Sequence, residues 1–195
     1  MVLAGGESRR MGRDKLLLEV GGVPLLHRVR DALSTRCAEI VVVGSGGESA
    51  RLGEISRISD ERRGGLGPLA GMETGLATAG NRLVFVAAGD MPFLSADLVC
   101  YLLERLETRD IAAVVPRHRG RTHPLCAAYD REILSQVRSV LDGGVRSVGE
   151  FLKDLDQVEY VEEHLRRFGD PDIFLMNVNS PEDLDRARAS YGDSR

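Results

Sequence analysis

A short segment near the amino terminus holds residues that could bind phosphate. The segment LAGGESRRMGRDK covers Leu3–Lys15 and begins at the end of a short apolar stretch that predicts a strand. Gly5 and Gly6 would let the backbone approach an anion closely and point N–H groups at it. Four cations share this segment: Arg9, Arg10, Arg13 and Lys15. A turn with solvated charges is the alternative, and this many cations beside two glycines favours phosphate binding.

Lys15 is a lysine in a chain whose positively charged residues are nearly all arginines. Of the 26 Lys and Arg residues, only Lys15 and Lys153 are lysines. A lysine ammonium is a compact point charge that suits one phosphate oxygen, whereas guanidinium is a planar fork. We therefore expect Lys15 to contact a triphosphate. The segment is not a P-loop, because Asp14 and not glycine precedes Lys15.

Asp90 is the candidate metal ligand. It follows the apolar run Leu83–Ala88, which predicts a buried strand, and Gly89 separates the two. Ligands of open α/β sheets bind beyond the carboxyl ends of the strands. A carboxylate at that place suits Mg²⁺, which takes one or two carboxylates together with phosphates and waters. The alternative is that Asp90 only caps the following turn.

Three further polar residues are candidates for the site. His123 lies in an arginine-rich segment, where it could act as a general base or could orient a loop and contact a second substrate; we favour the second role. Asn177 and Asn179 alternate with Val178, so both amides can face one side of an extended segment. A simple turn before a helix cap at Ser180 explains the two asparagines equally well.

Apolar runs alternate with segments of helical periodicity, which is typical of an α/β fold with a mostly parallel sheet. Strands are predicted at 2–4, 40–43, 57–59, 83–88, 111–115, 124–129 and 158–161, the last of them antiparallel. Helices are predicted at 25–33, 68–76, 95–106, 133–141 and 148–155, and from Pro181 onward. Pro116 is expected to end its strand, and 116–122 to form a loop.

Composition excludes several classes of protein. A net charge of −4 disfavours general binding to nucleic acid or to membrane surfaces. No apolar run approaches the roughly 20 residues that cross a bilayer, and the first ten residues lack the apolar stretch of a signal peptide. Three cysteines without CxxC spacing argue against disulfide scaffolds and zinc sites. We therefore expect a cytoplasmic protein with no nucleic-acid or membrane partner.

Taken together, the motifs resemble those of the molybdenum cofactor guanylyltransferases (the MobA family), which are nucleotidyltransferases of the nucleotide-diphospho-sugar transferase type. LAGGESRRMGRDK resembles their signature loop. Further motifs follow in the right order: GPLAG at 67–71, GDMPF at 89–93, HPL at 123–125 and NVNSPEDL at 177–184. The resemblance covers almost the whole chain. It implies one domain over 1–195 with a Rossmann-like, doubly wound sheet, an N-terminal half that binds nucleotide and a C-terminal part that binds the acceptor.

The resemblance also implies a reaction, a cofactor and partners. GMP is transferred from GTP to the terminal phosphate of molybdenum-bound molybdopterin, pyrophosphate is released, and Mg²⁺ assists. The implied catalytic residues are Lys15, Arg10 and Asp90, with Mg²⁺ on Asp90. The implied GTP contacts are Leu3, Ala4, Gly5, Gly6, Lys15, Asp60 and Asp90. The implied acceptor contacts are His123, Asn177 and Asn179. We expect a monomer whose product passes to molybdoenzymes or their chaperones.

One departure from the family pattern and three alternative functions remain. Many family members carry asparagine where Gly44 follows the second predicted strand, 40–43, which puts one nucleotide contact in doubt. The enzymatic alternatives are a molybdopterin cytidylyltransferase and a sugar-phosphate nucleotidyltransferase. The cytidylyltransferases typically carry Ala-Ala-Gly in place of Ala4, Gly5 and Gly6, which favours GTP here. The other alternative is an inactive nucleotide-binding or carrier-docking module, and intact Lys15 and Asp90 argue against it.

Overall fold

The computed structural model describes residues 1–5, 15–44, 56–58 and 67–193. Within these residues, eight strands form one sheet in the order β10-β7-β9-β6-β1-β4-β5, with β8 paired to β7. The strands are β1 (Val2–Leu3), β4 (Val41–Val43), β5 (Ser56–Ile58), β6 (Leu83–Ala88), β7 (Ala113–His118), β8 (Arg121–Thr122), β9 (Cys126–Asp130) and β10 (Val158–Val161). β9 is antiparallel to both of its neighbours and β8 is antiparallel to β7, whereas the other pairs are parallel. The predicted α/β fold with a mostly parallel sheet is confirmed.

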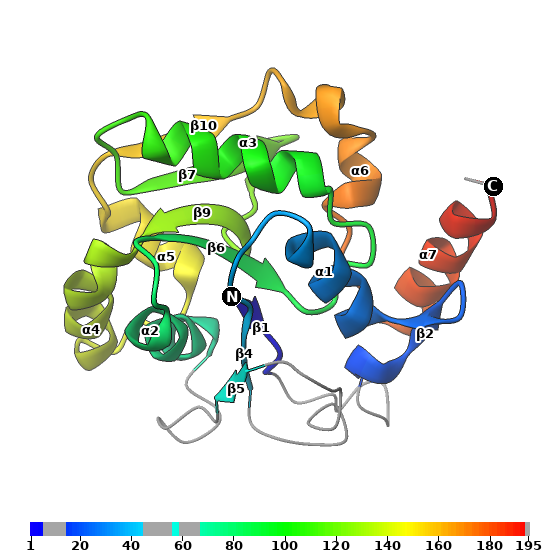
Figure 1. The fold of residues 1–195 in the computed structure, drawn as a ribbon, viewed down its shortest axis with the longest axis horizontal. Helices are drawn as coiled ribbons and strands as arrows, with labels where there is room; N and C mark the ends of the chain where they lie inside the picture. Colours follow the sequence, from blue (N-terminus) through cyan, green and yellow to red (C-terminus); the bar gives the residue numbers. More distant parts are fainter. Residues whose placement is uncertain (6–14, 45–55, 59–66, 194–195) are drawn as a thin grey trace.

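Helices cover both faces of this sheet (Figure 1). On one face lie α2 (Pro68–Thr78), α4 (Leu134–Asp142) and α5 (Val148–Asp154). On the other lie α1 (Leu25–Ser34), α3 (Ala96–Glu107) and α6 (Pro171–Phe174). Short 3₁₀ helices occur at η1 (Lys15–Leu17), η3 (Arg131–Ile133) and η4 (Leu165–Phe168), and α7 (Pro181–Asp193) ends the described chain. Each strand alternates its side chains between the two layers: Val41 and Val43 enter one core, and Val42 the other.

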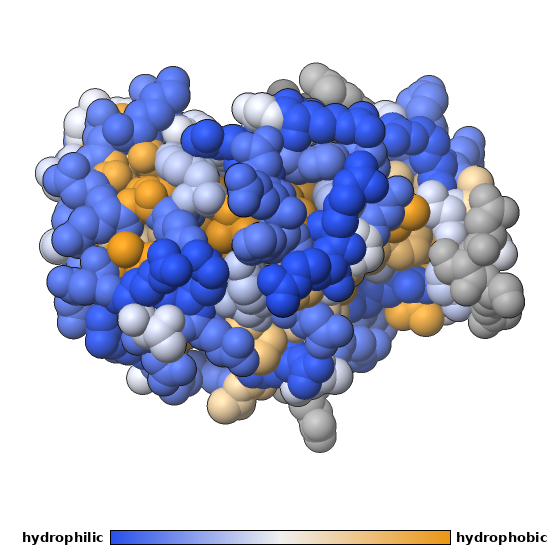
Figure 2. Space-filling model, turned by 90° about the horizontal axis from the view of Figure 1, so that it is seen from above, coloured by the Kyte–Doolittle hydropathy of each residue, from blue (hydrophilic) through white to orange (hydrophobic). Residues whose placement is uncertain are grey.

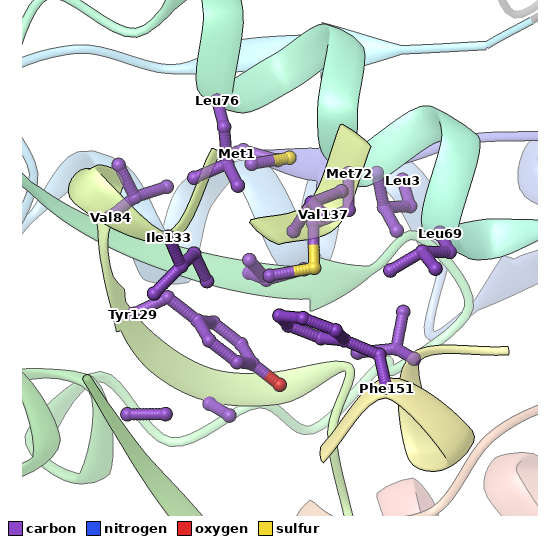
Figure 3. Close-up of a cluster of buried hydrophobic side chains, with 14 of the residues drawn as sticks. Met1, Leu3, Leu69, Met72, Leu76, Val84, Tyr129, Ile133, Val137 and Phe151 are labelled. Atoms are coloured by element: carbon purple, nitrogen blue, oxygen red, sulfur yellow. The ribbon is translucent and has the colours of Figure 1, made fainter. Parts of the chain in front are cut away.

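The core is mostly aliphatic, as the low aromatic content predicts. Figure 3 shows the layer beneath α2, where Met72 and Leu76 lie in one buried cluster with Tyr129 and Phe151. The Tyr129 hydroxyl donates to the carbonyl of Pro124 at 2.8 Å, so this buried polar group is satisfied. Figure 2 shows a face that is mostly hydrophilic, with smaller apolar areas between charged side chains. Among the described residues, no helix is both long and apolar enough to cross a membrane.

Two sequence predictions about the second half of the chain were wrong. Pro116 does not end its strand: it lies within β7, opposite Val161 of β10. Its missing N–H is tolerated there because β9 pairs with β7 only at Ala113 and Val114. Residues 116–122 are therefore the end of β7 and a hairpin to β8 instead of a loop. β10 is parallel to β7, not antiparallel, because β9 is antiparallel to β7 and the chain enters β10 from the same edge of the sheet at which β9 ends.

A small hairpin that the sequence analysis did not predict holds α7 in place. Its strands, β2 (Glu19–Val20) and β3 (Val23–Pro24), are too short to show an alternating pattern. Gly21 and Gly22 connect them with φ values of 61° and 76°, as a tight two-residue hairpin turn requires. The ring of Tyr191 on α7 lies against Gly21, and the Arg28 guanidinium lies 4.5 Å from the centre of that ring.

Replacing Gly21 with alanine should destabilise the fold more than the same change at Gly22. Both substitutions carry the cost of a positive φ, of order 1–2 kcal/mol. A Cβ at Gly21 would also lie 2.1 Å from a ring carbon of Tyr191, whereas a Cβ at Gly22 meets nothing within 4 Å. We expect Gly21→Ala to lower the free energy of unfolding by roughly 1–3 kcal/mol more than Gly22→Ala, as overpacking does. Urea titration of the two variants measures the difference. Equal losses would mean that the Tyr191 ring moves aside without cost.

Candidate functional site

Asp90 is the centre of a hydrogen-bonded cluster at the carboxyl edge of the sheet. It follows β6 after Gly89, whose N–H donates to the carbonyl of Leu3 at 3.0 Å. A Cβ at Gly89 would lie 3.1 Å from the Leu16 side chain and 3.3 Å from that carbonyl, so the close approach of these segments favours glycine. The Asp90 side chain is only 9% exposed. A carboxylate this deeply buried needs partners for both of its oxygens.

Lys15 supplies the charge that balances Asp90. Its Nζ lies 2.5 Å from Oδ2 of Asp90 and also donates to Oδ1 of Asn179 at 3.1 Å. Lys15 opens η1, and the next residue, Leu16, is buried in the core that includes α1 and α3, which fixes the start of this short helix. The structure therefore brings together the two residues, Lys15 and Asp90, that the sequence analysis assigned to phosphate and metal.

The C-terminal segment Asn177–Asn179 completes the cluster. Nδ2 of Asn177 donates to Oδ1 of Asp90 at 2.6 Å, and the Val178 N–H donates to the Asp90 carbonyl at 3.0 Å. Val178 itself is fully buried in a small core with residues of β2, α1 and α7. Alternation along the segment thus sends one side chain into that core and two amides toward Asp90 and Lys15. The sequence analysis assigned both asparagines to the acceptor and did not predict these contacts.

A helix cap fixes the end of that segment. Oδ2 of Asp183 accepts hydrogen bonds from the backbone N–H groups of Asn179 and Ser180, both at 3.1 Å. The Asp183 N–H donates in return to Oγ of Ser180 at 3.2 Å. This reciprocal arrangement is a capping box at the start of α7, and it confirms the predicted cap at Ser180. The cap holds the backbone of Asn179 where its amide reaches Lys15.

The first loop, within the segment Leu3–Lys15, is described only at Leu3–Gly5 and at Lys15. Leu3 and Ala4 lie at the carboxyl edge, and the Ala4 N–H donates to the carbonyl of Val43 at 2.7 Å. This backbone amide is paired within the sheet, so the predicted contact of Ala4 with GTP would have to use another atom of the residue. Of the predicted site residues, Gly6, Arg10 and Asp60 lie outside the described residues.

Gly44 lies directly against the start of this loop. A Cβ at Gly44 would stand 2.7 Å from the Ala4 carbonyl oxygen and 2.9 Å from its carbon, both backbone atoms. An asparagine at this position would therefore force the two strand ends apart. Because Gly44 has no side chain, the ends of β1 and β4 can approach each other closely.

His123 lies beside the Asp90 turn without joining the cluster. The backbone N–H of His123 donates to the Pro116 carbonyl at 2.9 Å, and its backbone carbonyl accepts from the N–H of Cys126 at 3.0 Å. The neighbouring Leu125 carbonyl accepts from Ala88, at the end of β6, at 2.8 Å. Burial, followed by the charges of Arg121 and His118, lowers the pKa of His123 to about 4. The imidazole is therefore neutral at neutral pH and a weak base.

A cavity of about 290 Å³ lies at the opposite edge of the sheet, lined in part by Met1, Cys37, Arg36 and Arg82. Its two arginines already have partners, because Arg36 pairs with Asp97 and Arg82 with Asp130, each at 2.7 Å. These cations are committed to ion pairs and are poorly placed to bind a triphosphate. The cluster around Asp90 is the better candidate.

The donor atoms of the Asp90 cluster suit a hard cation. One carboxylate and the amide side chains of Asn177 and Asn179 are close together, and oxygen atoms are the ligands that Mg²⁺ prefers. Within the part of the chain that the structure describes, no group of three or more His, Cys, Asp or Glu residues could form a metal cage. This combination fits a metal that is held partly by substrate phosphates. Together with the Lys15 ammonium, it can bind and neutralise a polyphosphate.

Comparisons with known proteins agree with this geometry. The model of the MobA-like NTP transferase domain matches residues 1–158. The Pelotomaculum thermopropionicum protein named "Probable molybdenum cofactor guanylyltransferase" is 38% identical, over 100% of this chain and 94% of its own length. A molybdenum cofactor guanylyltransferase of Syntrophotalea carbinolica is 35% identical, over 96% and 89% of the two chains.

The solved structures give the same result. Molybdopterin-guanine dinucleotide biosynthesis protein A from Archaeoglobus fulgidus superposes with a TM-score of 0.85 at 29% identity, covering 98% of this chain and 97% of that one. A cytidylyltransferase from Thermus thermophilus, at 21% identity, a TM-score of 0.72 and coverage of 97% and 96%, shares the fold alone. Because the family model spans most of the chain and full-length relatives exceed 30% identity, the chain belongs to the family of MobA-like NTP transferases.

Proposed function

We propose that this protein transfers GMP from GTP to the terminal phosphate of molybdenum-bound molybdopterin, forming the guanine dinucleotide form of the cofactor. The observation that carries the proposal is the Lys15–Asp90 pair at the carboxyl edge of the sheet, at 2.5 Å. Full-length relatives with guanylyltransferase names support the choice of reaction. Both groups belong to segments that are separate in the sequence and meet only at this edge.

The reaction needs little beyond positioning and charge neutralisation. An oxygen of the acceptor phosphate attacks the α-phosphorus of GTP, the bond to the bridging oxygen of the β-phosphate breaks, and pyrophosphate leaves with the electron pair. A phosphate monoester is already anionic near neutral pH, so the nucleophile needs no protein base. The lowered pKa of His123, about 4, agrees with a role in orientation instead of proton transfer.

Asp90 is the residue that we assign to Mg²⁺, with the amide side chains of Asn177, which presents its nitrogen to Asp90, and Asn179, which presents its oxygen to Lys15, close by. When bound, the metal would neutralise phosphate charge and polarise the α-phosphate. Lys15 holds Oδ2 of Asp90, so a cation on that oxygen requires the ammonium to move. The phosphates of a bound nucleotide offer the ammonium a new partner. We therefore expect nucleotide and metal to bind together more tightly than either does alone.

The same proposal includes a cytoplasmic location, action as a monomer and delivery of the product to molybdoenzymes or their chaperones. Cys37, Cys100 and Cys126 are free thiols, which supports a reducing compartment.

GTP should stabilise the protein more than CTP does. The relatives named as guanylyltransferases and the Ala4-Gly5 start of the first loop favour a guanine site, and a ligand that binds only the folded state raises the melting temperature. Thermal unfolding with GTP, CTP, UTP and ATP at equal concentration and with Mg²⁺ measures the preference. Equal shifts for GTP and CTP, or a larger shift with CTP, would reject the guanylyl assignment and favour a cytidylyltransferase.

Asp90→Asn should abolish GMP transfer while the chain still folds. The amide is nearly isosteric and can keep one hydrogen bond, but it loses the charge that holds Lys15 and would hold the metal. Pyrophosphate release across a magnesium titration measures activity, and circular dichroism reports folding. Asp97→Asn is the matched control, since Asp97 is an exposed aspartate in the same part of the chain. Near-normal transfer by Asp90→Asn would place the metal elsewhere.

Lys15→Ala should lower kcat by about 100-fold or more, the scale of losing one preorganised electrostatic contact. GTP affinity should fall less, because negative charge builds on the departing pyrophosphate in the transition state. Lys15→Arg should restore only part of the rate, since a planar fork cannot replace a point charge without displacing Asp90. Lys153→Ala removes the other lysine of the chain, which is exposed on α5, and serves as the control.

Single-turnover transfer and separate GTP titrations divide the effect between chemistry and binding. If Lys15→Ala weakens GTP binding and leaves the chemical step unchanged, Lys15 acts in binding only and this mechanism is wrong.

A further inference from the structure

The hairpin between β7 and β8 is rich in positive charge and lies at the same edge of the sheet as Asp90. β7 and β6 run in the same direction, because β9 between them is antiparallel to both. The carboxyl ends of β6 and β7 therefore lie at the same edge of the sheet. In the order of the sheet, the hairpin is on the β9 side of β6, whereas β1 is on the other side. If GTP binds on the β1 side, as the expected contacts of Leu3–Gly6 imply, the hairpin lies on the side of β6 that remains for the acceptor.

Hydrogen bonds connect the hairpin closely to the Asp90 turn. The chain leaves β8 at Thr122, and His123 donates back to the carbonyl of Pro116 at 2.9 Å. Three residues later it enters β9, and the Leu125 carbonyl accepts from Ala88 at 2.8 Å. Only Gly89 separates Ala88 from Asp90. The β7–β8 hairpin is thus joined to β9, the strand next to β6, which leads to Asp90.

Three of the four basic side chains in 117–121 are already engaged. The Arg117 guanidinium lies 4.2 Å from the centre of the Tyr160 ring. Nε2 of His118 lies 3.0 Å from Oδ1 of Asp172 on α6, and the Arg119 guanidinium lies 2.5 Å from Oδ2 of the same carboxylate. Arg119 and Gly120 adopt φ values of 49° and 73°, which close the hairpin with a tight turn. These contacts fix the hairpin against two neighbouring elements.

Arg121 is the exception. It is exposed and sits opposite His118 in the hairpin ladder, and it makes no ion pair with any residue that the structure describes. Its charge is close enough to His123 to contribute to the lowered pKa of that imidazole. The hairpin therefore presents a guanidinium that has no ion pair among the described residues, on a segment that is hydrogen-bonded to the end of β6, two residues before Asp90.

We propose that Arg121 binds the phosphate monoester of the acceptor and so positions its oxygen for attack. This proposal rests on the proposed function and adds an anchoring residue to it. A guanidinium can hold two phosphate oxygens at once, which fixes orientation as well as position. Because Arg117, His118 and Arg119 already hold the backbone of the hairpin, the conformational cost of binding the acceptor is mainly that of ordering the Arg121 side chain. Arg121 is a binding residue for the acceptor and does not contact GTP.

Three variants separate charge from shape. Arg121→Gln removes the charge, Arg121→Lys keeps a charge without the fork, and Thr122→Ala changes an exposed neighbour on the same hairpin. For Arg121→Gln we expect the KM for the acceptor, molybdenum-bound molybdopterin, to rise about tenfold or more, as for a lost charge-assisted hydrogen bond. Arg121→Lys should recover part of this loss, and Thr122→Ala should match the wild type. The Kd for GTP should stay within about twofold of the wild-type value in all three, since the expected GTP contacts of Leu3–Gly6 place the nucleotide on the β1 side of β6, away from the hairpin.

Salt gives a second measurement that a purely structural role would not change. The KM of the wild type for the acceptor should rise with KCl more steeply than that of Arg121→Gln, because one screened charge pair is missing in the variant. Melting temperatures of the wild type and Arg121→Gln should agree, since Arg121 has no ion pair among the described residues.

Each adverse outcome has a separate meaning. If the wild type transfers GMP and Arg121→Gln keeps a normal KM for the acceptor, the proposal for Arg121 is wrong and the proposed function stands. If Arg121→Gln weakens GTP binding instead, the arginine binds nucleotide phosphate and the proposal is also wrong. If Thr122→Ala raises the KM as much as Arg121→Gln does, the shape of the hairpin matters and not the charge. If the wild type transfers no GMP, the proposed function itself fails.

Discussion

The buried carboxylate of Asp90 is the constraint on which the site depends. An aspartate removed from water is costly unless both of its oxygens are paired. Here Lys15 takes one oxygen and Asn177 the other, and the backbone of Val178 takes the carbonyl of the same residue. Three segments that are far apart in the sequence must therefore converge before Asp90 can be buried at low cost. The site is assembled by the same interactions that satisfy this carboxylate.

Separate parts of the core hold each of these segments in position. Leu16 anchors Lys15 in the core that includes α1 and α3, and β6 carries Asp90 between two neighbouring strands. Val178 anchors the two asparagines in the small core formed with the β2–β3 hairpin and α7. The hairpin and the C-terminal helix thus serve the site indirectly, because they fix the segment whose amides reach Lys15 and Asp90. A substitution in that small core would displace Asn177 and Asn179 and so disturb their contacts with Asp90 and Lys15.

The sequence predicted most of the elements and singled out all four side chains of the cluster, but not the contacts between them. A buried strand followed by an acidic residue pointed to Asp90, and the scarcity of lysine pointed to Lys15. The pairs they form join residues 75, 87 and 164 positions apart, and periodicity over a dozen residues carries no information about such pairs. Pro116 was predicted to end its strand because proline has no N–H to donate to a neighbouring strand. No such bond is needed at Pro116, because β9 pairs with β7 only at Ala113 and Val114. The β2–β3 hairpin was missed because its strands are only two residues long.

Net charge says little about what this edge of the sheet can bind. The chain as a whole is acidic, with a charge of −4. Several of its arginines are neutralised in ion pairs, as Arg82 is by Asp130 and Arg105 by Glu159. Anion binding depends on the cations that are left uncompensated where the ligand sits, because the local potential is set by nearby groups. Lys15 can exchange Asp90 for a phosphate, and Arg121, on the β9 side of β6, has no carboxylate partner among the described residues. An acidic protein can therefore bring two phosphorylated substrates together by placing a small number of cations on either side of one strand.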